Sequence, residues 1–99
     1  MPFFLRVIFF IMDFKRFLYT DYFVSETGIV KNKKGIVLIP QKKVNFLFHD
    51  ISINRKIRRF GLARMVLICH KFRVDYIILK AKHIDGDNNN NHITNLKWI

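Results

Sequence analysis

The stretch AKHIDGDNNNNHITNLKWI, from Ala81 to Ile99, decides the fold of this sequence. It holds two of the four histidines, a run of four asparagines and the single tryptophan. His83 follows an apolar run and precedes a loop whose Asp-Gly and Asn residues favour turns. A histidine at a strand end beside a polar loop is well placed as a general base, because the ordinary pKa of histidine lies near neutrality. An isolated histidine of this kind is more often structural, so His83 is a candidate general base only in combination with other motifs.

The composition indicates one small domain with a polyanionic partner. A chain of 99 residues can build one modest core, and a hydrophobic fraction of 51% excludes wholesale disorder. Lys and Arg number 18 against 7 Asp and Glu, which gives a net charge of +11. Such an excess is typical of proteins that bind nucleic acid or an anionic membrane surface. The single cysteine, Cys69, excludes an intramolecular disulfide and a cysteine-based zinc cluster.

The first residues, MPFFLRVIFFIM, are strongly apolar. They are shorter than the roughly 20 residues of a membrane helix and are interrupted by Arg6, so we expect no stable membrane insertion. Both Met1 and Met12 can serve as the start, and we expect residues 1–11 to be a dispensable leader. The alternative is a membrane-surface protein that uses residues 1–12 together with its Lys/Arg clusters.

Short strands and turns are predicted over most of residues 12–60, which we expect to form a β-rich, DNA-binding module. YFVSETGIV (22–30) can turn at Glu26-Thr27-Gly28, and NKKG (32–35) is a polar turn before IVLIP. VNFLFHDISI is a longer strand candidate, and Asn54-Arg55-Lys56 turns the chain into the basic segment IRRF.

A helix and a terminal finger are predicted over residues 61–99. Helical spacing gives one apolar stripe, which we expect to be buried in a helix near 61–72: Leu62, Met65, Val66, Cys69 and Phe72. RVDYIILKAKH and NLKWI then predict two further strands. The predicted fold class is therefore α+β, with a small antiparallel β-sheet followed by one helix and a hairpin-like finger that carries His83.

Three motifs together resemble the HNH endonucleases of phages and mobile elements. His83-Ile84-Asp85-Gly86-Asp87, the pair Asn90-Asn91 and Asn95-Leu96-x-Trp98 resemble the nuclease motif itself. YFVSETGIV resembles the Tyr-x-Val-Ser-x-x-Gly-x-Val module that often precedes it, and LARMVLICHKF resembles the helix between the two. The resemblance extends over about residues 17–99.

The resemblance implies a ββα-metal finger that acts on DNA with a divalent ion, Mg²⁺ or Mn²⁺. His83 would be the general base, and Asn95 would brace the loop so that the histidine points correctly. Asn90 and Asn91 would be structural, and Trp98 would pack beneath the finger. Basic residues would hold the DNA phosphates, and the candidates are Lys31, Lys33, Lys34, Lys42, Lys43, Arg55, Lys56, Arg58, Arg59 and Lys82.

The sequence departs from the family pattern at three places. Lys82 stands where many relatives carry an Asp or Asn that ligates the metal, and Ala63 replaces a usual histidine. The family's third site residue lies on a helix after the tryptophan, whereas this sequence ends at Ile99, so we expect an incomplete finger with unknown metal ligands. Two functions stay open: a metal-dependent DNA endonuclease or its truncated remnant, and a non-catalytic nucleic-acid-binding protein. Either would act inside a cell, for example a host infected by a virus or phage.

Overall fold

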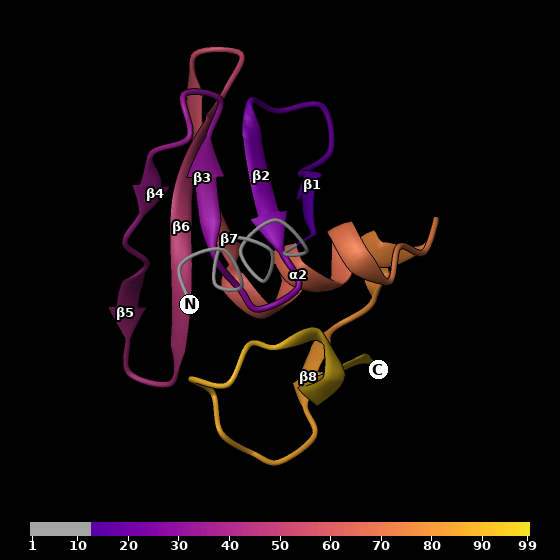
Figure 1. Ribbon diagram of the computed structural model, residues 1–99. Helices are drawn as coiled ribbons and strands as arrows, with labels where there is room; N and C mark the ends of the chain where they lie inside the picture. Colours follow the sequence, from indigo (N-terminus) through magenta and orange to yellow (C-terminus); the bar gives the residue numbers. More distant parts are fainter. Residues whose placement is uncertain (1–12) are drawn as a thin grey trace, which may run out of the picture.

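The computed structural model describes residues 13–99 and confirms the α+β class. One antiparallel sheet has the order β1 (Phe14–Arg16), β2 (Tyr22–Ser25), β3 (Val30–Asn32) and β4 (Val37–Leu38). A second antiparallel sheet consists of β5 (Gln41–Lys43), β6 (Phe46–Ile53) and β7 (Lys56–Gly61). Helix α2 (Leu62–His70) follows, and β8 (Ala81–His83) pairs with β9 (Leu96–Trp98) in a two-stranded ribbon. Figure 1 shows this ribbon at the end of the molecule opposite the β6–β7 turn.

The expected leader, residues 1–11, and the alternative start at Met12 lie outside the described residues. Within residues 13–99, no helix combines the length and the apolar character that crossing a bilayer requires.

The predicted turns of the β-rich module are confirmed. β2 and β3 flank the Glu26-Thr27-Gly28 turn, in which Gly28 has a φ of +91°. In the β6–β7 hairpin, Ile53 pairs with Lys56, so Asn54 and Arg55 form a two-residue connection. Their φ angles of 50° and 66° are those of a type I′ turn, the geometry that matches the twist of the two strands. The basic hairpin tip is therefore a tight turn with a defined direction.

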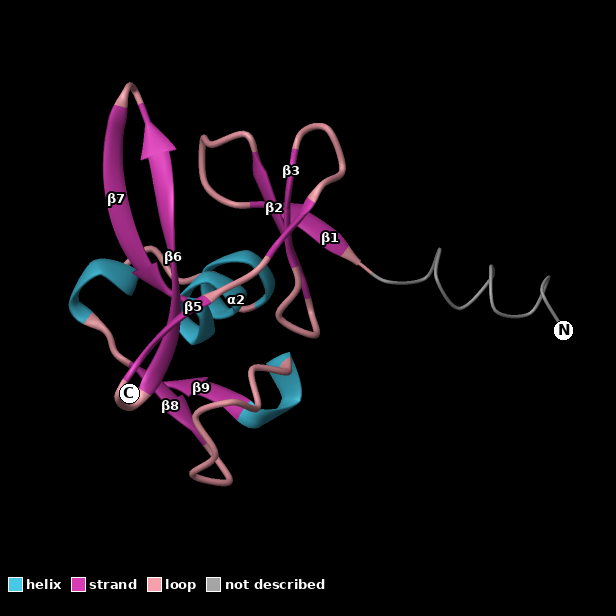
Figure 2. Cartoon of the chain, turned by 90° about the vertical axis from the view of Figure 1, so that its left-hand side faces the viewer, coloured by secondary structure: helices cyan, strands magenta, loops and turns pink. Residues whose placement is uncertain are grey.

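Helix α2 is buried on most of its surface. Six of its nine residues are buried, namely Leu62, Ala63, Met65, Val66, Leu67 and Ile68. The helix contacts β1 and β2 of the first sheet, β6 and β7 of the second, and both strands of the terminal ribbon. Figure 2 shows α2 at the centre of these elements. The core around it includes Phe17, Val24, Val30, Ile51 and Leu96.

The prediction of the buried stripe was wrong at its C-terminal end. Leu62, Met65 and Val66 are buried as expected, and Cys69 is half-buried. Phe72, however, is 56% exposed, because the helix ends at His70. Lys71 has left the helical region with φ −138° and ψ 54°, which turns the following side chain away from the stripe.

The strand predicted for RVDYIILKAKH was also wrong for most of its length. Only Ala81–His83 form a strand, and residues 76–78 form a 3₁₀ turn. The guanidinium of Arg64 donates to the carbonyl oxygens of Tyr76, at 2.7 Å, and of Leu79. A side chain on the helix thus takes acceptors that a neighbouring strand would otherwise have used.

His49 is a buried histidine in the middle of β6. It is 4% exposed, lies opposite Phe60 of β7, and its Nε2 has no hydrogen-bond partner in the described structure. Burial lowers the pKa of His49 below its ordinary value, and the nearby Asp50 carboxylate opposes this shift. The folded protein therefore favours the neutral imidazole.

We expect His49→Leu to raise the free energy of unfolding and to flatten its pH dependence. Because the pKa of His49 is lowered in the folded protein, the contribution of the neutral ring is complete above about pH 6.5, and it is lost as the pH falls below this value toward the lower pKa of the folded state. Leucine removes both the titration and the unpaired nitrogen, a change of about 1 kcal/mol at pH 7. Urea unfolding of both proteins between pH 5 and 7.5 measures the effect. If the free energy of unfolding of the leucine variant falls as steeply with decreasing pH as that of the wild type, His49 is not the source of this pH dependence.

Candidate active site

His83 and its neighbour Lys82 lie on opposite faces of the terminal ribbon. In the β8–β9 pair, His83 lies opposite Leu96 and Lys82 lies opposite Lys97. Successive residues of a strand project to opposite faces. His83 is accordingly half-buried on the face of the fully buried Leu96, whereas Lys82 and Lys97 share the exposed face. The ammonium group of Lys82 thus faces solvent and does not face the imidazole of His83.

His83 makes one side-chain hydrogen bond, to Asn91. The distance from His83 Nε2 to Asn91 Oδ1 is 2.8 Å, and Asn91 is only 5% exposed. The amide nitrogen of Asn91 faces the carbonyl oxygen of Asn88 at 3.4 Å, which leaves its amide oxygen directed at the imidazole. An amide oxygen can only accept, so His83 donates through Nε2–H and the neutral ring carries its free lone pair on Nδ1.

Asn95 fastens the loop between the two strands. Its side-chain nitrogen donates to Asp85 Oδ1 and to the carbonyl oxygen of Asn90, both at 2.9 Å, and its side-chain oxygen accepts from the Asp85 N–H at 3.0 Å. Its own carbonyl accepts from Ile84 N–H at 2.7 Å. Asn95 is 8% exposed, so its side of these bonds is shielded from water, whereas Asp85 is exposed.

Asp85 is the acceptor at the centre of this loop. Asn90 Nδ2 donates to its Oδ2 at 2.9 Å, and the backbone N–H of Asp87 donates to its Oδ1 at 2.8 Å. The hydrogen bond from Asn90 is the largest cause that holds the pKa of Asp85 below its ordinary value, followed by those from Asp87 and Asn95. The carboxylate is therefore a structural anion of the loop.

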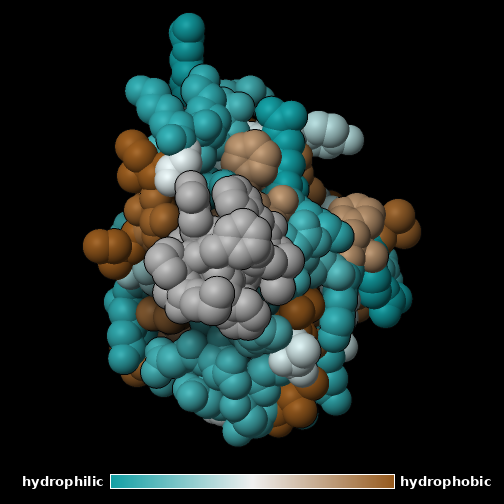
Figure 3. All heavy atoms as spheres, in the orientation of Figure 1, coloured by the Kyte–Doolittle hydropathy of each residue, from teal (hydrophilic) through white to brown (hydrophobic). Residues whose placement is uncertain are grey.

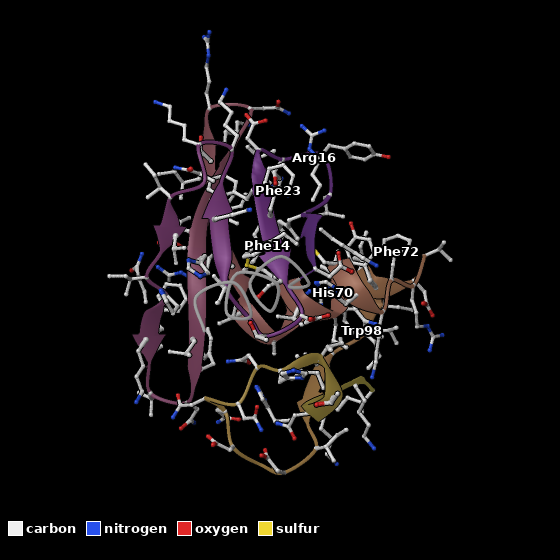
Figure 4. The ribbon with its side chains drawn as sticks, in the orientation of Figure 1. Phe14, Arg16, Phe23, His70, Phe72 and Trp98 are labelled. Atoms are coloured by element: carbon white, nitrogen blue, oxygen red, sulfur yellow. The ribbon has the colours of Figure 1, made fainter. Side chains whose placement is uncertain are left out.

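Trp98 fixes the other end of the ribbon to helix α2. Its indole Nε1–H donates to the carbonyl oxygen of Lys71 at 2.7 Å, and Lys71 Nζ donates back to Leu96 at 3.2 Å. At the last residue of the helix, His70 Nε2 lies 2.9 Å from the carbonyl oxygen of Val24. Figure 4 shows His70 and Trp98 beside this end of the helix. The ribbon is thus held by the same helix that supports the first sheet.

His83 lines a small cleft between the ribbon, α2 and the second sheet. The cleft has a volume of about 150 Å³, and its walls include Phe46 and Leu47 of β6 and Leu62 and Ala63 of α2. Asn91 contributes to the same wall as His83. The first turn of α2 carries no acidic residue and no side-chain cap, so its partial positive charge is not neutralised locally. The N-terminal end of α2 therefore lies beside the cleft that His83 lines.

The described residues do not assemble a site for a divalent metal. Among residues 13–99, no group of three or more His, Cys, Asp or Glu side chains is arranged to hold an ion. Mg²⁺ requires several well-placed oxygen ligands. The residue before His83 is a lysine, and Asp85 directs both carboxylate oxygens to donors within its own loop. The oxygen ligands that Mg²⁺ or Mn²⁺ would need are therefore not brought together here.

The candidate DNA-contacting residues of the β6–β7 hairpin fall into two groups. Arg55, Lys56 and Arg58 are exposed at or near the tip. Arg59 is engaged within the protein, because its Nε donates to Asp50 at 2.9 Å and its guanidinium lies 4.0 Å from the centre of the Phe48 ring. This hydrogen bond is the largest cause that lowers the pKa of the Asp50 carboxyl.

The remaining lysines extend the basic surface around the second sheet. Lys33 and Lys34 occupy the β3–β4 turn and share a surface hollow with Ser52 of β6, so they lie at the same end of the molecule as the hairpin tip. Lys42 and Lys43 are exposed on β5, whereas Lys31 lies 4.0 Å above the Phe14 ring. Figure 3 shows hydrophilic side chains over both the hairpin end and the finger end.

Comparison with known proteins identifies one informative relative. The structure resembles that of the HNH homing endonuclease I-HmuI, from a study of its DNA binding and cleavage, with a TM-score of 0.75 and 30% sequence identity. The chain shares an HNH endonuclease fold. The match covers 89% of this chain and 52% of that endonuclease, so the chain spans about half of its length. No protein-family model matches the sequence, and no curated protein matches it significantly.

The sequence motif places Asn95 and Asn91 in the finger, but it does not indicate which contacts each of them makes. Asn95 binds the loop, and Asn91 is the residue that contacts His83. A run of four asparagines carries no signal that distinguishes one member from another. Only the path of the folded loop determines which amide reaches the imidazole.

We expect Asn95→Asp to loosen the finger. The substitution keeps the shape of the side chain but replaces a donor to two oxygens with an anion that faces Asp85. Loss of two hydrogen bonds should cost about 2 kcal/mol locally, before charge repulsion is added. Amide exchange of Ile84 and Asp85, followed by NMR, should accelerate accordingly.

Asn89→Asp is the matched control for this prediction. It adds the same charge to the same loop, at an exposed position whose side chain makes no hydrogen bond within the described residues. If the amides of Ile84 and Asp85 exchange at the same rate in the two variants, Asn95 does not brace the loop.

Proposed function

We propose that this chain is a DNA-acting module of the HNH endonuclease type, in which His83 is the general base for phosphodiester hydrolysis. The hydrogen bond between His83 and Asn91 is the observation that carries the proposal, because it leaves Nδ1 free to accept a proton. The similarity to I-HmuI, a homing endonuclease studied for DNA binding and cleavage, supports the substrate class.

In this mechanism the residues of the chain hold and move one proton. His83 Nδ1 accepts a proton from water, the oxygen of that water attacks the phosphorus, and the bond from phosphorus to the leaving oxygen breaks; the leaving oxygen then takes a proton from solvent. Asn91 keeps Nε2 protonated throughout, so the ring turns only one basic nitrogen toward the water. The cleft beside the first turn of α2 would accommodate the phosphate group.

DNA would be held by cations outside this cleft. The exposed residues of the hairpin tip and the β3–β4 turn are the strongest candidates, because within residues 13–99 they form no ion pair with an acidic side chain: Lys33, Lys34, Arg55, Lys56 and Arg58. Arg59 and Lys31 rank lower, since each already contacts an aromatic ring of the protein. Contacts of this kind are to the phosphate backbone and would give largely sequence-independent, salt-sensitive affinity.

A second candidate function is non-catalytic DNA binding. The observation that favours it is the lack of free metal ligands next to His83 among the described residues. Lys82 lies on the opposite face of the ribbon, and the Asp85 carboxylate accepts hydrogen bonds within its own loop. A chain with this site would keep the fold and the charge of an endonuclease while its histidine catalysed little.

Plasmid nicking by the 99-residue chain, with and without Mg²⁺ or Mn²⁺, separates these functions. We expect nicking by this chain to be barely detectable, because general-base catalysis contributes only about 10²–10⁴-fold whereas enzymes commonly exceed about 10⁶-fold. The nicking should disappear in His83→Ala, while DNA affinity should stay unchanged in this variant and in the presence of EDTA.

Each outcome of this experiment supports or excludes one of the two functions. Nicking that depends on His83 supports the endonuclease proposal. Tight DNA binding without nicking supports the second candidate. Nicking that survives in His83→Ala removes His83 as the base, and a chain that binds no DNA excludes both functions.

A further inference from the structure

The β2–β3 turn of the first sheet lies directly against the finger loop. Gly28 in this turn has a φ of +91°, and a Cβ added to it would lie 3.2 Å from both the Cβ and the carbonyl oxygen of Asn91. The same two segments are also joined by a hydrogen bond, in which the N–H of Ile93 donates to the carbonyl oxygen of Glu26 at 2.7 Å. Two segments more than sixty residues apart in the sequence thus meet backbone to backbone.

The turn is itself held in a fixed shape. Ser25 is fully buried, and its Oγ accepts from the N–H of Ile29 at 2.9 Å and of Thr27 at 3.3 Å. Backbone bonds between Ser25 and Ile29, at 2.8 Å, and from Gly28 to Ser25, at 3.2 Å, close it further. The surface that meets Asn91 is therefore rigid, and it is anchored in β2, which packs on α2.

We propose that this turn positions the imidazole of His83, with Gly28 as the positioning residue and Asn91 as the intermediary. Contact with Gly28 fixes the Asn91 backbone, and this in turn holds the Asn91 amide oxygen 2.8 Å from His83 Nε2. The absence of a side chain at position 28 permits this approach, since any Cβ would push Asn91 away from it. The inference rests on the proposed function for its catalytic meaning, because a general base must present one defined nitrogen.

The turn therefore has a role beyond stability. A loop that merely connected two strands would leave Asn91 free to shift, and His83 could then exchange between its two neutral tautomers. Holding Asn91 biases the ring toward Nε2–H. The first sheet, which carries no candidate catalytic group, thereby determines which nitrogen of His83 can act as a base.

Gly28→Ala and Gly35→Ala form a matched pair that tests this inference. Gly35 also has a positive φ, +82°, but a Cβ there would meet nothing within 4 Å. Both variants therefore introduce alanine into an unfavourable backbone region, and only Gly28→Ala also displaces Asn91. The readout is the tautomer ratio of His83 in the free 99-residue chain, from its imidazole ¹⁵N chemical shifts in alkaline buffer.

We expect Gly28→Ala to reduce the ratio of the Nε2–H to the Nδ1–H tautomer roughly fivefold, the factor that corresponds to one hydrogen bond of about 1 kcal/mol. Gly35→Ala should leave the ratio as in the wild type. Equal ratios in Gly28→Ala and Gly35→Ala would overturn the inference. Because the readout requires neither DNA nor cleavage, it is independent of whether the proposed function holds.

A second set of measurements covers the case in which Gly28→Ala does not fold. In the wild-type chain, nuclear Overhauser contacts should connect the Gly28 Hα protons with the Asn91 side chain, and His83 should be in the Nε2–H form. Asn91→Asp, which retains an acceptor oxygen, should keep this tautomer, whereas Asn91→Ala should lose the bias. A wild-type His83 in the Nδ1–H form, or a bias that survives in Asn91→Ala, would overturn the inference.

Discussion

Burial of helix α2 is the packing interaction on which the rest of the described structure depends. The sheets are small, and the terminal ribbon has strands of only three residues, so none of them has a large apolar face of its own. Each instead places a few side chains on the same helix: Val24 and Val30 from the first sheet, Ile51 from the second and Leu96 from the ribbon. One helix thereby fixes the position of all three sheets relative to one another.

The finger combines this apolar anchor with a loop made almost entirely of polar contacts. Leu96 and Trp98 attach the ribbon to α2, whereas Asn95 and Asp85 close the loop with hydrogen bonds. A polar loop held only by itself would open readily. The contacts of Ile93 and Asn91 with the β2–β3 turn support this loop from outside, next to the half-buried His83.

The sequence predicted those parts of the fold whose signals are local. The turns at Gly28 and at Asn54, the long strand β6 and the start of the helix follow from residue types and periodicity alone. The predictions were wrong where a distant side chain decides the structure. Arg64 holds residues 76–79 out of a strand, although their apolar pattern favours one.

The candidate site shows the same division between local and distant causes. His83 and Asn95 were identifiable as candidates from their motif, and they lie at the two ends of the finger loop: His83 ends β8 and Asn95 immediately precedes β9. The contact of Asn91 with His83, the opposite orientation of Lys82 and the engagement of Arg59 by Asp50 depend on how strands pair and loops close. No periodicity of the sequence encodes these relations.

The proposed function requires one DNA duplex to contact both the finger and the basic hairpin tip, which lie at opposite ends of the molecule (Figure 1). Amide chemical-shift mapping of the 99-residue chain during titration with a short duplex, in EDTA, tests it most directly. The claim predicts shifts at Lys33, Lys34 and the hairpin tip and, in the same titration, at His83 and Asn91, with little change around the apolar cleft lined by Leu18, Tyr19 and Phe72. Shifts confined to that cleft, or shifts at the hairpin that leave the finger unaffected, would contradict it.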